Sequence, residues 1–282
     1  MWVCRNNTEH LYLAGPILMY MDDVCPAPVK ERYWEIDAIR GFSLLAMIAF
    51  HTVFLLGVFH IINVDVWLGL GVYLPLGTSV FVIISGTSLI LRHGRMLDKP
   101  RRAYYMAILK RGIEIMLIGL GVSVIASLLI LVFINDGRYV YFNFLQMMGL
   151  SMILCIPFLR FGKWSLIPAV SFILLGLFLE TIKGPALLMV FGILPPDFYP
   201  RDFFPVFPWV GVMLLGVFLG SLLYPNGIRR FNLPSAGKIG QSLALIGRYP
   251  LEIYLAHIPV IGSVILVIVV VSGMLGCPIG HL

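Results

Sequence analysis

Residues 34–54 read WEIDAIRGFSLLAMIAFHTVF, and this stretch decides how the rest of the chain is interpreted. It has the length and apolar content of a membrane-crossing helix, which needs about 20 predominantly apolar residues. It nevertheless carries Asp37, Arg40 and His51. Ionisable side chains are costly in hydrocarbon and by default mark functional sites there. The stretch therefore predicts a membrane protein with a polar site in its first span.

The composition agrees with this interpretation. Of the 282 residues, 60% are hydrophobic and 12% are charged, and the mean hydropathy is +0.96. Soluble domains carry about 25% charged residues, so we expect an all-α, polytopic helical bundle in a membrane. Apolar runs predict about seven transmembrane spans, near 38–59, 67–91, 112–134, 140–159, 164–182, 206–224 and 250–273. The apolar run within 183–205 is too short to cross, which predicts an interfacial or re-entrant segment.

The transmembrane domain is expected at residues 32–276, between an N-terminal arm at 1–31 and a short tail at 277–282. The arm contains an apolar run too short to span and no evident cleavable signal peptide, so we expect it to be interfacial or disordered. The four cysteines are Cys4, Cys25, Cys155 and Cys277, and their spacing is not that of metal ligands. We therefore expect no metal site.

Basic residues predict the orientation of the spans. With the N-terminus in the cytoplasm, 17 of the 20 Lys and Arg residues fall in cytoplasmic segments, and only Arg138, Lys183 and Arg201 fall outside. This asymmetry is the positive-inside signature. The net charge of +6 then reflects cytoplasmic loops, and we expect no nucleic-acid partner. The predicted location is the cell membrane, with lipid around the spans.

The ionisable residues of the first span fall on one helical face. His51 is eleven positions after Arg40, so the two side chains return to within about 20° of each other and lie roughly 16 Å apart in depth. Asp37 lies near the same face. His60 is nine residues further on, about 180° around the helix, near the outer surface. The structural alternative is an interfacial Asp37–Arg40 ion pair, a histidine that fills a packing gap, and His60 as an interfacial anchor.

The last span carries a second histidine at a similar depth. Residues 246–261 read IGRYPLEIYLAHIPVI, and Pro250 suits the first turn of a helix that enters from the cytoplasm. His257 lies seven residues further along, and Pro259 can kink the helix beside it. Two histidines at similar depth on separate spans are able to share one cavity, although the sequence does not say that they face each other.

Further polar groups are expected to enter from the outer side. They are Asn143 and Gln146 in FNFLQMMGLSM, and Asp202 and Trp209 in RDFFPVFPWVG. Trp209 also fits an aromatic residue of the membrane interface. Asp202 also fits a solvated carboxylate at a helix N-terminus, where the helix dipole favours negative charge.

These motifs together resemble one family. Arg40-Gly41 with His51 resembles the Arg-x10-His signature of transmembrane acyltransferases. FNFLQMMGLSM, DFFPVFPWVG and GRYPLEIYLAHIP resemble further blocks of prokaryotic relatives of the catalytic domain of heparan-α-glucosaminide N-acetyltransferase. The resemblance runs from about residue 33 to 270. It implies that acetyl-CoA donates an acetyl group to a sugar amine or hydroxyl across a membrane, with no metal.

The resemblance also assigns roles by position. His51 would be the catalytic histidine, with Arg40 its motif partner, and Asp202, Trp209 and His257 would occupy motif positions. The chain departs from the family pattern at Gln146, where prokaryotic relatives often have His, and at Tyr249-Pro250, which replaces a common His-Ser. In the animal lysosomal enzyme of this family, the catalytic histidine is the one nearer the non-cytoplasmic end of this region. This makes His60 the rival to His51 for the catalytic role.

Two functions follow. In the first, the chain is an acetyltransferase: Asp37, Arg40, Arg92 and Arg95 form the acetyl-CoA site, and Asn143, Gln146, Asp202 and Trp209 bind a sugar-like acceptor, or a small amine or alcohol. His51, supported by His257, would act as general base or carry the acetyl group itself. In the second, the histidines belong to a small-solute or proton-coupled transporter, for which internal repeats or paired broken helices would be expected. A homodimer is compatible with either.

Overall fold

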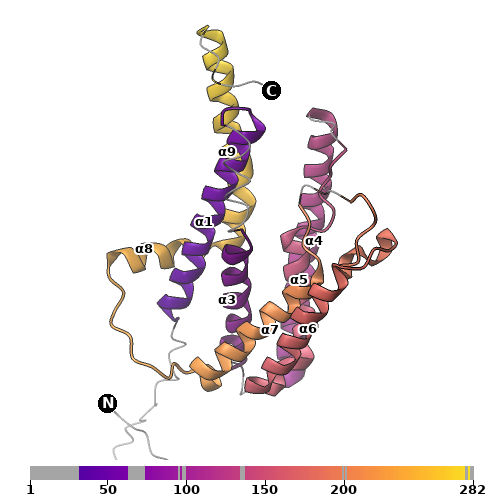
Figure 1. The fold of residues 1–282 in the computed structure, drawn as a ribbon. Helices are drawn as coiled ribbons and strands as arrows, with labels where there is room; N and C mark the ends of the chain where they lie inside the picture. The colour runs from indigo at the N-terminus through magenta and orange to yellow at the C-terminus, as the bar shows by residue number, and fades with distance from the viewer. Residues whose placement is uncertain are drawn as a thin grey trace, which may run out of the picture. The chain divides into compact units, whose positions relative to one another are not determined.

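The computed structural model describes residues 32–62, 74–94, 96, 100–133, 137–198, 200, 202–276 and 279. Its elements are α1 (Trp34–Val58), α3 (Leu74–Gly94), α4 (Arg101–Phe133), α5 (Phe144–Cys155), η1 (Ile156–Ser165), α6 (Leu166–Leu179), η2 (Ala186–Phe191), α7 (Val206–Leu223), η3 (Pro225–Gly227), α8 (Lys238–Ile246) and α9 (Pro250–Met274) (Figure 1). The described residues contain no strand, only two isolated bridges, which confirms the all-α prediction. The predicted arm at 1–31 and most of the tail lie outside the described residues.

The described chain contains six helical stretches that are long and apolar enough to cross a membrane. They are Trp34–Val58, Leu76–Gly94, Arg101–Val132, Phe144–Leu179, Val206–Leu223 and Pro250–Met274. This count of candidate stretches is six, where the sequence predicts about seven spans. The difference arises because the predicted spans 140–159 and 164–182 fall within the single stretch Phe144–Leu179.

That stretch is not one straight helix. Gly162 has φ 52° and ψ −118°, which breaks the helix inside η1. Beyond the break, α6 runs antiparallel to α7: Gly176 abuts Pro208 near the start of α7, whereas Gly162 faces Ser221 near its end. The chain thus folds back at Gly162, a reversal that a residue with a side chain would resist because φ is positive.

The segment at 183–205 does not cross a membrane by itself. Its only helical element in the described residues is the six-residue 3₁₀ helix η2, which contains no buried residue. After η2 the chain returns to α5, where the amide of Phe204 donates to the carbonyl of Phe142 at 2.8 Å and Asp202 forms an isolated bridge with Val140. This segment therefore closes the end of the bundle where α5 and α7 begin.

Two close backbone approaches hold α8 across α1 (Figure 1). A Cβ atom added at Gly41 would overlap the carbonyl oxygen of Leu243, and one added at Gly247 would overlap the carbonyl oxygen of Asp37. Small residues at helix interfaces allow such approaches in membrane proteins, where packing rather than the hydrophobic effect drives association. The glycine that follows Arg40 in the sequence motif is therefore required by the fold.

The buried core lies among α3, α4, α5 and α7, and includes Val82, Ile108, Met147, Val210, Met213 and Val217. The outward surfaces of the long helices are apolar as well: Val124, Ile125, Leu128, Val132, Leu174, Leu177, Phe178, Val264 and Val267 are all exposed. Soluble proteins rarely expose such continuous apolar surface. This surface is suited to contact with lipid.

Candidate functional site between α1 and α9

His51 of α1 and His257 of α9 face each other. Their ring centroids lie 4.8 Å apart, and the rings make an angle of 69°. His257 is buried, with 6% of its surface exposed, and His51 is half-buried. The two histidines predicted to lie at similar depth on separate spans therefore form one pair, which the sequence did not establish.

Backbone contacts determine which nitrogen of each ring carries the hydrogen. Nδ1 of His51 lies 2.9 Å from the carbonyl oxygen of Met47, and Nδ1 of His257 contacts the carbonyl oxygen of Tyr254. A carbonyl oxygen only accepts hydrogen bonds, so Nδ1 is the donor in both rings. In each neutral ring Nε2 is then the acceptor, with its lone pair available.

Within the described part of the chain, Nε2 of His257 is buried and has no hydrogen-bond partner. An unsatisfied buried polar atom costs about 1–3 kcal/mol, and native proteins contain few of them. The pair therefore offers a buried acceptor position beside a second imidazole. An N–H or O–H group placed there would satisfy the position, and this is the requirement for abstraction of a proton from an amine or hydroxyl.

A chain of aromatic rings links the histidine pair to the ends at which α5 and α7 begin. Tyr254 lies 5.4 Å from His257 and stacks on Phe144 at 5.8 Å. Phe144 in turn contacts Phe204, which lies 5.6 Å from Trp209. The predicted site residues His257 and Trp209 thus belong to one continuous cluster of aromatic rings. Trp209 is half-buried in this cluster and is not a fully exposed aromatic residue of the membrane interface.

Asp202 lies close to this cluster, and its carboxylate interacts electrostatically with Tyr254. Burial raises the pKa of Asp202 from 3.8 to about 7, because desolvation disfavours the charged form. A carboxyl with a pKa near 7 exchanges protons at neutral pH, and such shifted values are characteristic of functional sites. Asp202 is therefore not the fully solvated carboxylate of the structural alternative.

Arg40 joins three parts of the chain. Its guanidinium donates to Oδ1 of Asp37 at 2.8 Å, to the carbonyl oxygen of Gly247 at 3.2 Å, and to Oγ of Ser88 at 2.7 Å. Its side chain is 14% exposed and that of Asp37 is 6% exposed. These contacts connect α1, α3 and the turn before α9, so the ion pair has a structural role. Binding of acetyl-CoA by Asp37 and Arg40 stays a prediction.

Asn143 and Gln146 form the N-terminal cap of α5. The Asn143 side chain accepts from the amide of Gln146, the Gln146 side chain accepts from the amide of Asn143, and the Asn143 amide group donates to the carbonyl oxygen of Gly119 at 2.7 Å. Ser123 donates to Gln146 at 3.1 Å. This capping box accounts for both residue types at this spacing, and their predicted role in binding the acceptor is untested.

The other predicted site residues lie apart from the histidine pair. His60 follows the end of α1, exposed and with φ 55°. Because the helix ends at Val58, the helical angle predicted for His60 does not apply. Arg92 is exposed in the last turn of α3, and Arg95 lies outside the described residues. The choice between His51 and His60 as the catalytic residue stays a prediction.

Sequence reasoning did not single out Tyr254 or Ser88. Tyr254 is three residues before His257 and so lies on the same helical face, which was a usable signal. Ser88 carries no such signal, because only the packing of α3 against α1 brings it to Arg40.

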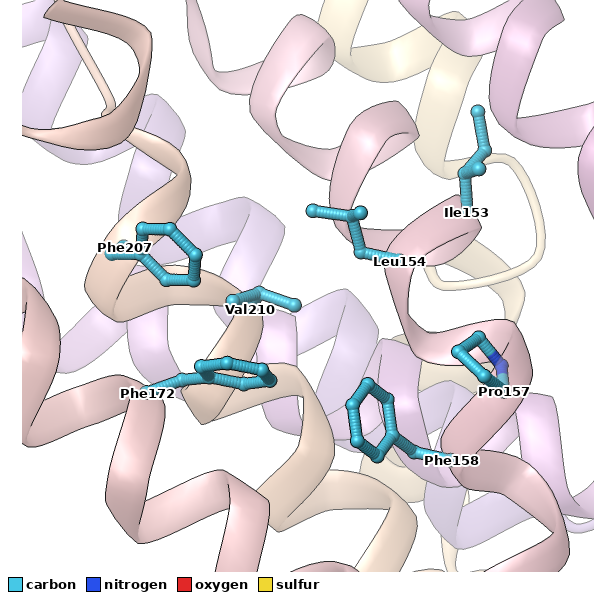
Figure 2. Close-up of a pocket in the computed structure, with 7 residues that line it drawn as sticks. All are labelled: Ile153, Leu154, Pro157, Phe158, Phe172, Phe207 and Val210. Atoms are coloured by element: carbon cyan, nitrogen blue, oxygen red, sulfur yellow. The ribbon is translucent and has the colours of Figure 1, made fainter. Parts of the chain in front are cut away.

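A separate pocket of about 220 Å³ lies between α5, η1, α6 and α7. Figure 2 shows that it is lined by apolar side chains, among them Phe158, Phe172 and Phe207. It offers no side chain able to exchange a proton, and neither histidine lines it. Among the described residues, no group of His, Cys, Asp and Glu side chains is arranged to hold a metal ion.

The described residues form an all-helical protein with six candidate membrane-spanning helices and a histidine pair between α1 and α9. Residues 32–259 match the family described as heparan-alpha-glucosaminide N-acetyltransferase, catalytic, and the chain belongs to this family. No curated protein matched the sequence, and no solved structure matched it either. The family membership confirms the resemblance noted in the sequence and indicates a membrane acetyltransferase.

Proposed function

We propose that this protein transfers an acetyl group from acetyl-CoA to an amine or hydroxyl of a sugar-like acceptor, in a reaction that joins the two sides of the cell membrane. The observation that carries the proposal is the His51–His257 pair, in which both Nδ1 atoms are engaged by backbone carbonyls and the Nε2 atoms are left as acceptors. The family membership supports acetyl-CoA as the donor. The identity of the acceptor rests on the family description.

In the direct route, Nε2 of His51 takes a proton from the acceptor N–H or O–H while the acceptor attacks the thioester carbonyl. The carbon–sulfur bond breaks, and the proton passes to the leaving thiolate to give CoA. In the alternative route, Nε2 attacks the thioester carbonyl, the carbon–sulfur bond breaks, and CoA leaves as the thiol with the proton released by the imidazole. The acceptor then attacks the acetyl group of the acyl-imidazole, the bond from this group to Nε2 breaks, and the proton of the acceptor returns to the imidazole. His257 orients His51 in both routes through the contact between the rings.

The orientation we propose places the start of α1 and the turn before α9 at the cytoplasmic side, because of the distribution of basic residues. The α5–α6 reversal at Gly162 supports two crossings within Phe144–Leu179, and hence seven crossings in all. Acetyl-CoA would then enter from the side of Arg40 and Arg92, and the acceptor from the side of Asp202 and Trp209.

Release of CoA from acetyl-CoA by the purified protein tests the proposal. An acetyltransferase releases CoA at a rate that depends on an added acceptor, and the label of [¹⁴C]acetyl-CoA appears on that acceptor. A panel of amino sugars, sugar alcohols and small amines identifies the substrate class. Uptake of solute into proteoliposomes without any CoA release would instead show a transporter.

The two chemical routes are separated by incubation with labelled acetyl-CoA in the absence of acceptor. Label that stays on the protein after denaturation, and is released by hydroxylamine, indicates an acyl-imidazole. No retained label, together with turnover that requires both substrates at once, indicates direct transfer.

A further inference from the structure

A second candidate site lies at α8, away from the histidine pair. A cavity of about 660 Å³ is lined by Lys238, Gln241, Ser242 and Arg248, together with Trp34 from the first turn of α1 and two apolar residues. Its volume is in the range of small-molecule sites. Among the described residues, those that line it include Lys238 and Arg248 and no acidic residue, so its charge is positive.

The cavity is formed by one face of a short helix. Lys238, Gln241, Ser242 and Leu245 recur at the spacing of a single helical face. The adjoining face, with Gly240, Ala244 and Gly247, packs toward α1; a Cβ atom added at Gly240 would come within 3.0 Å of the Trp34 ring. Close packing on α1 thus leaves the polar face of α8 directed into the cavity.

The two cationic side chains of the cavity, Lys238 and Arg248, form no ion pair with another described residue. The described structure has ion pairs at Arg40, Arg111 and Arg229, but none that involves Lys238 or Arg248 within its described residues. Both are exposed at the cavity. With Gln241 and Ser242 they present several hydrogen-bond donors to one space, an arrangement that suits the oxygens of a phosphate group.

The position of α8 indicates where such a phosphate group would come from. The chain between Leu223 and Pro250 connects two candidate membrane spans, so α8 lies at one membrane surface. On the same helix, Ile239 is 79% exposed and Leu245 is 55% exposed. A short helix that bears basic residues, apolar residues and a neighbouring tryptophan is typical of the headgroup region of a bilayer.

We propose that this cavity binds the phosphodiester headgroup of an anionic phospholipid. Lys238 and Arg248 contact the phosphate, Gln241 and Ser242 donate further hydrogen bonds, and Ile239 and Leu245 lie against the acyl chains. The site depends only on the α1–α8 packing and is independent of the proposed enzymatic function.

Binding of dioctanoyl phosphatidylglycerol to the purified full-length protein tests the proposal, measured in detergent by native mass spectrometry. The double change Lys238→Gln with Arg248→Gln should weaken binding about tenfold or more, since each basic residue near an anionic lipid contributes roughly fivefold. The matched control is Arg160→Gln with Lys163→Gln, which removes the same charge from exposed positions on η1 and should change binding less than about threefold. The charge-retaining pair Lys238→Arg with Arg248→Lys should bind nearly as well as the parent, which separates loss of charge from loss of folding.

Three results would overturn the proposal. Equal weakening in the η1 control would show non-specific attraction to basic surface. Equal binding of dioctanoyl phosphatidylcholine would show that the anionic headgroup is not recognised. Displacement of the lipid by adenosine 3′,5′-bisphosphate in the parent protein, but not in the Lys238/Arg248 variant, would assign the cavity to the nucleotide phosphates of CoA instead.

Discussion

Replacement of His51 by Ala should separate catalysis from folding. Among the described residues, the side chain makes one hydrogen bond, to the carbonyl oxygen of Met47 in its own helix, and edge contacts with His257 at 4.8 Å and with Phe50 at 5.5 Å. A net hydrogen bond contributes about 0.5–1.5 kcal/mol and an aromatic pair about 0.5–1.5 kcal/mol. One hydrogen bond and two ring contacts give an expected loss of stability of about 1.5–4.5 kcal/mol, which is below the roughly 5–15 kcal/mol by which native proteins are stable.

The expected loss of rate is larger. A positioned acid–base group contributes about 10²–10⁴-fold, which corresponds to roughly 2.7–5.5 kcal/mol of transition-state stabilisation. Acetyl-CoA should still bind, because the proposed phosphate contacts lie about eleven residues nearer the cytoplasm, or roughly 16 Å along the helix. The assay compares acceptor-dependent CoA release, acetyl-CoA binding by calorimetry, and thermal unfolding in detergent for the parent and the variant.

His60→Ala is the matched control, since His60 is an exposed histidine just beyond the end of α1. It should lose much less activity than His51→Ala. The reasoning is refuted if His60→Ala is inactive while His51→Ala still turns over, because the chemistry would then lie at the end of α1 rather than between α1 and α9.

Three further changes test the acceptor side, the ion pair and the orientation. Since the pKa of Asp202 is raised to about 7, its carboxyl is neutral below that pH and charged above it. The KM for an amine acceptor should therefore fall as the pH rises through 7. Asp202→Asn should raise this KM above pH 7 and abolish its change with pH, with the affinity for acetyl-CoA nearly unchanged. If Arg40 binds a CoA phosphate, Arg40→Gln should weaken acetyl-CoA binding about 10–100-fold, as for other charged hydrogen bonds. The added change Asp37→Asn should not restore binding. Recovery in the double variant would show that Arg40 only pairs with Asp37 and does not contact CoA. The orientation is tested with single-cysteine variants made in a cysteine-free background and treated in intact cells with an impermeant thiol reagent. The reagent should label the Lys183→Cys variant and leave the Arg101→Cys variant unlabelled. The reverse pattern would contradict the proposed orientation.

The sequence was a sound guide to the helices and a weaker guide to their connections. Hydropathy is a local property, so the spans near 38–59, 206–224 and 250–273 agree with α1, α7 and α9 within a few residues. The segment at 140–182 was less regular, because η1 continues α5 past Cys155 and the reversal takes place at Gly162.

The sequence of the α5 cap contained a structural signal, but its two polar residues were predicted to bind the acceptor. Asn143 and Gln146 have the N-cap and N3 spacing of a capping box, which the hydrogen bonds confirm. A polar pair at the beginning of an apolar helix has a structural explanation of its own, so its presence near the membrane surface does not by itself indicate a ligand.

The amino-acid sequence alone determined that the chain is a helical membrane protein, that its first and last spans carry histidines at comparable depth, and to which family it belongs. These conclusions depend on composition, on spacing along single helices and on short motifs. Only the tertiary structure decided that His51 faces His257, that Tyr254 connects the pair to Asp202, and that α8 encloses a basic cavity with Trp34. Each of these depends on the rotation of one helix against another, which contacts such as those of Gly41 and Gly247 determine. Contacts between residues some two hundred positions apart are not recorded in any local pattern of the chain.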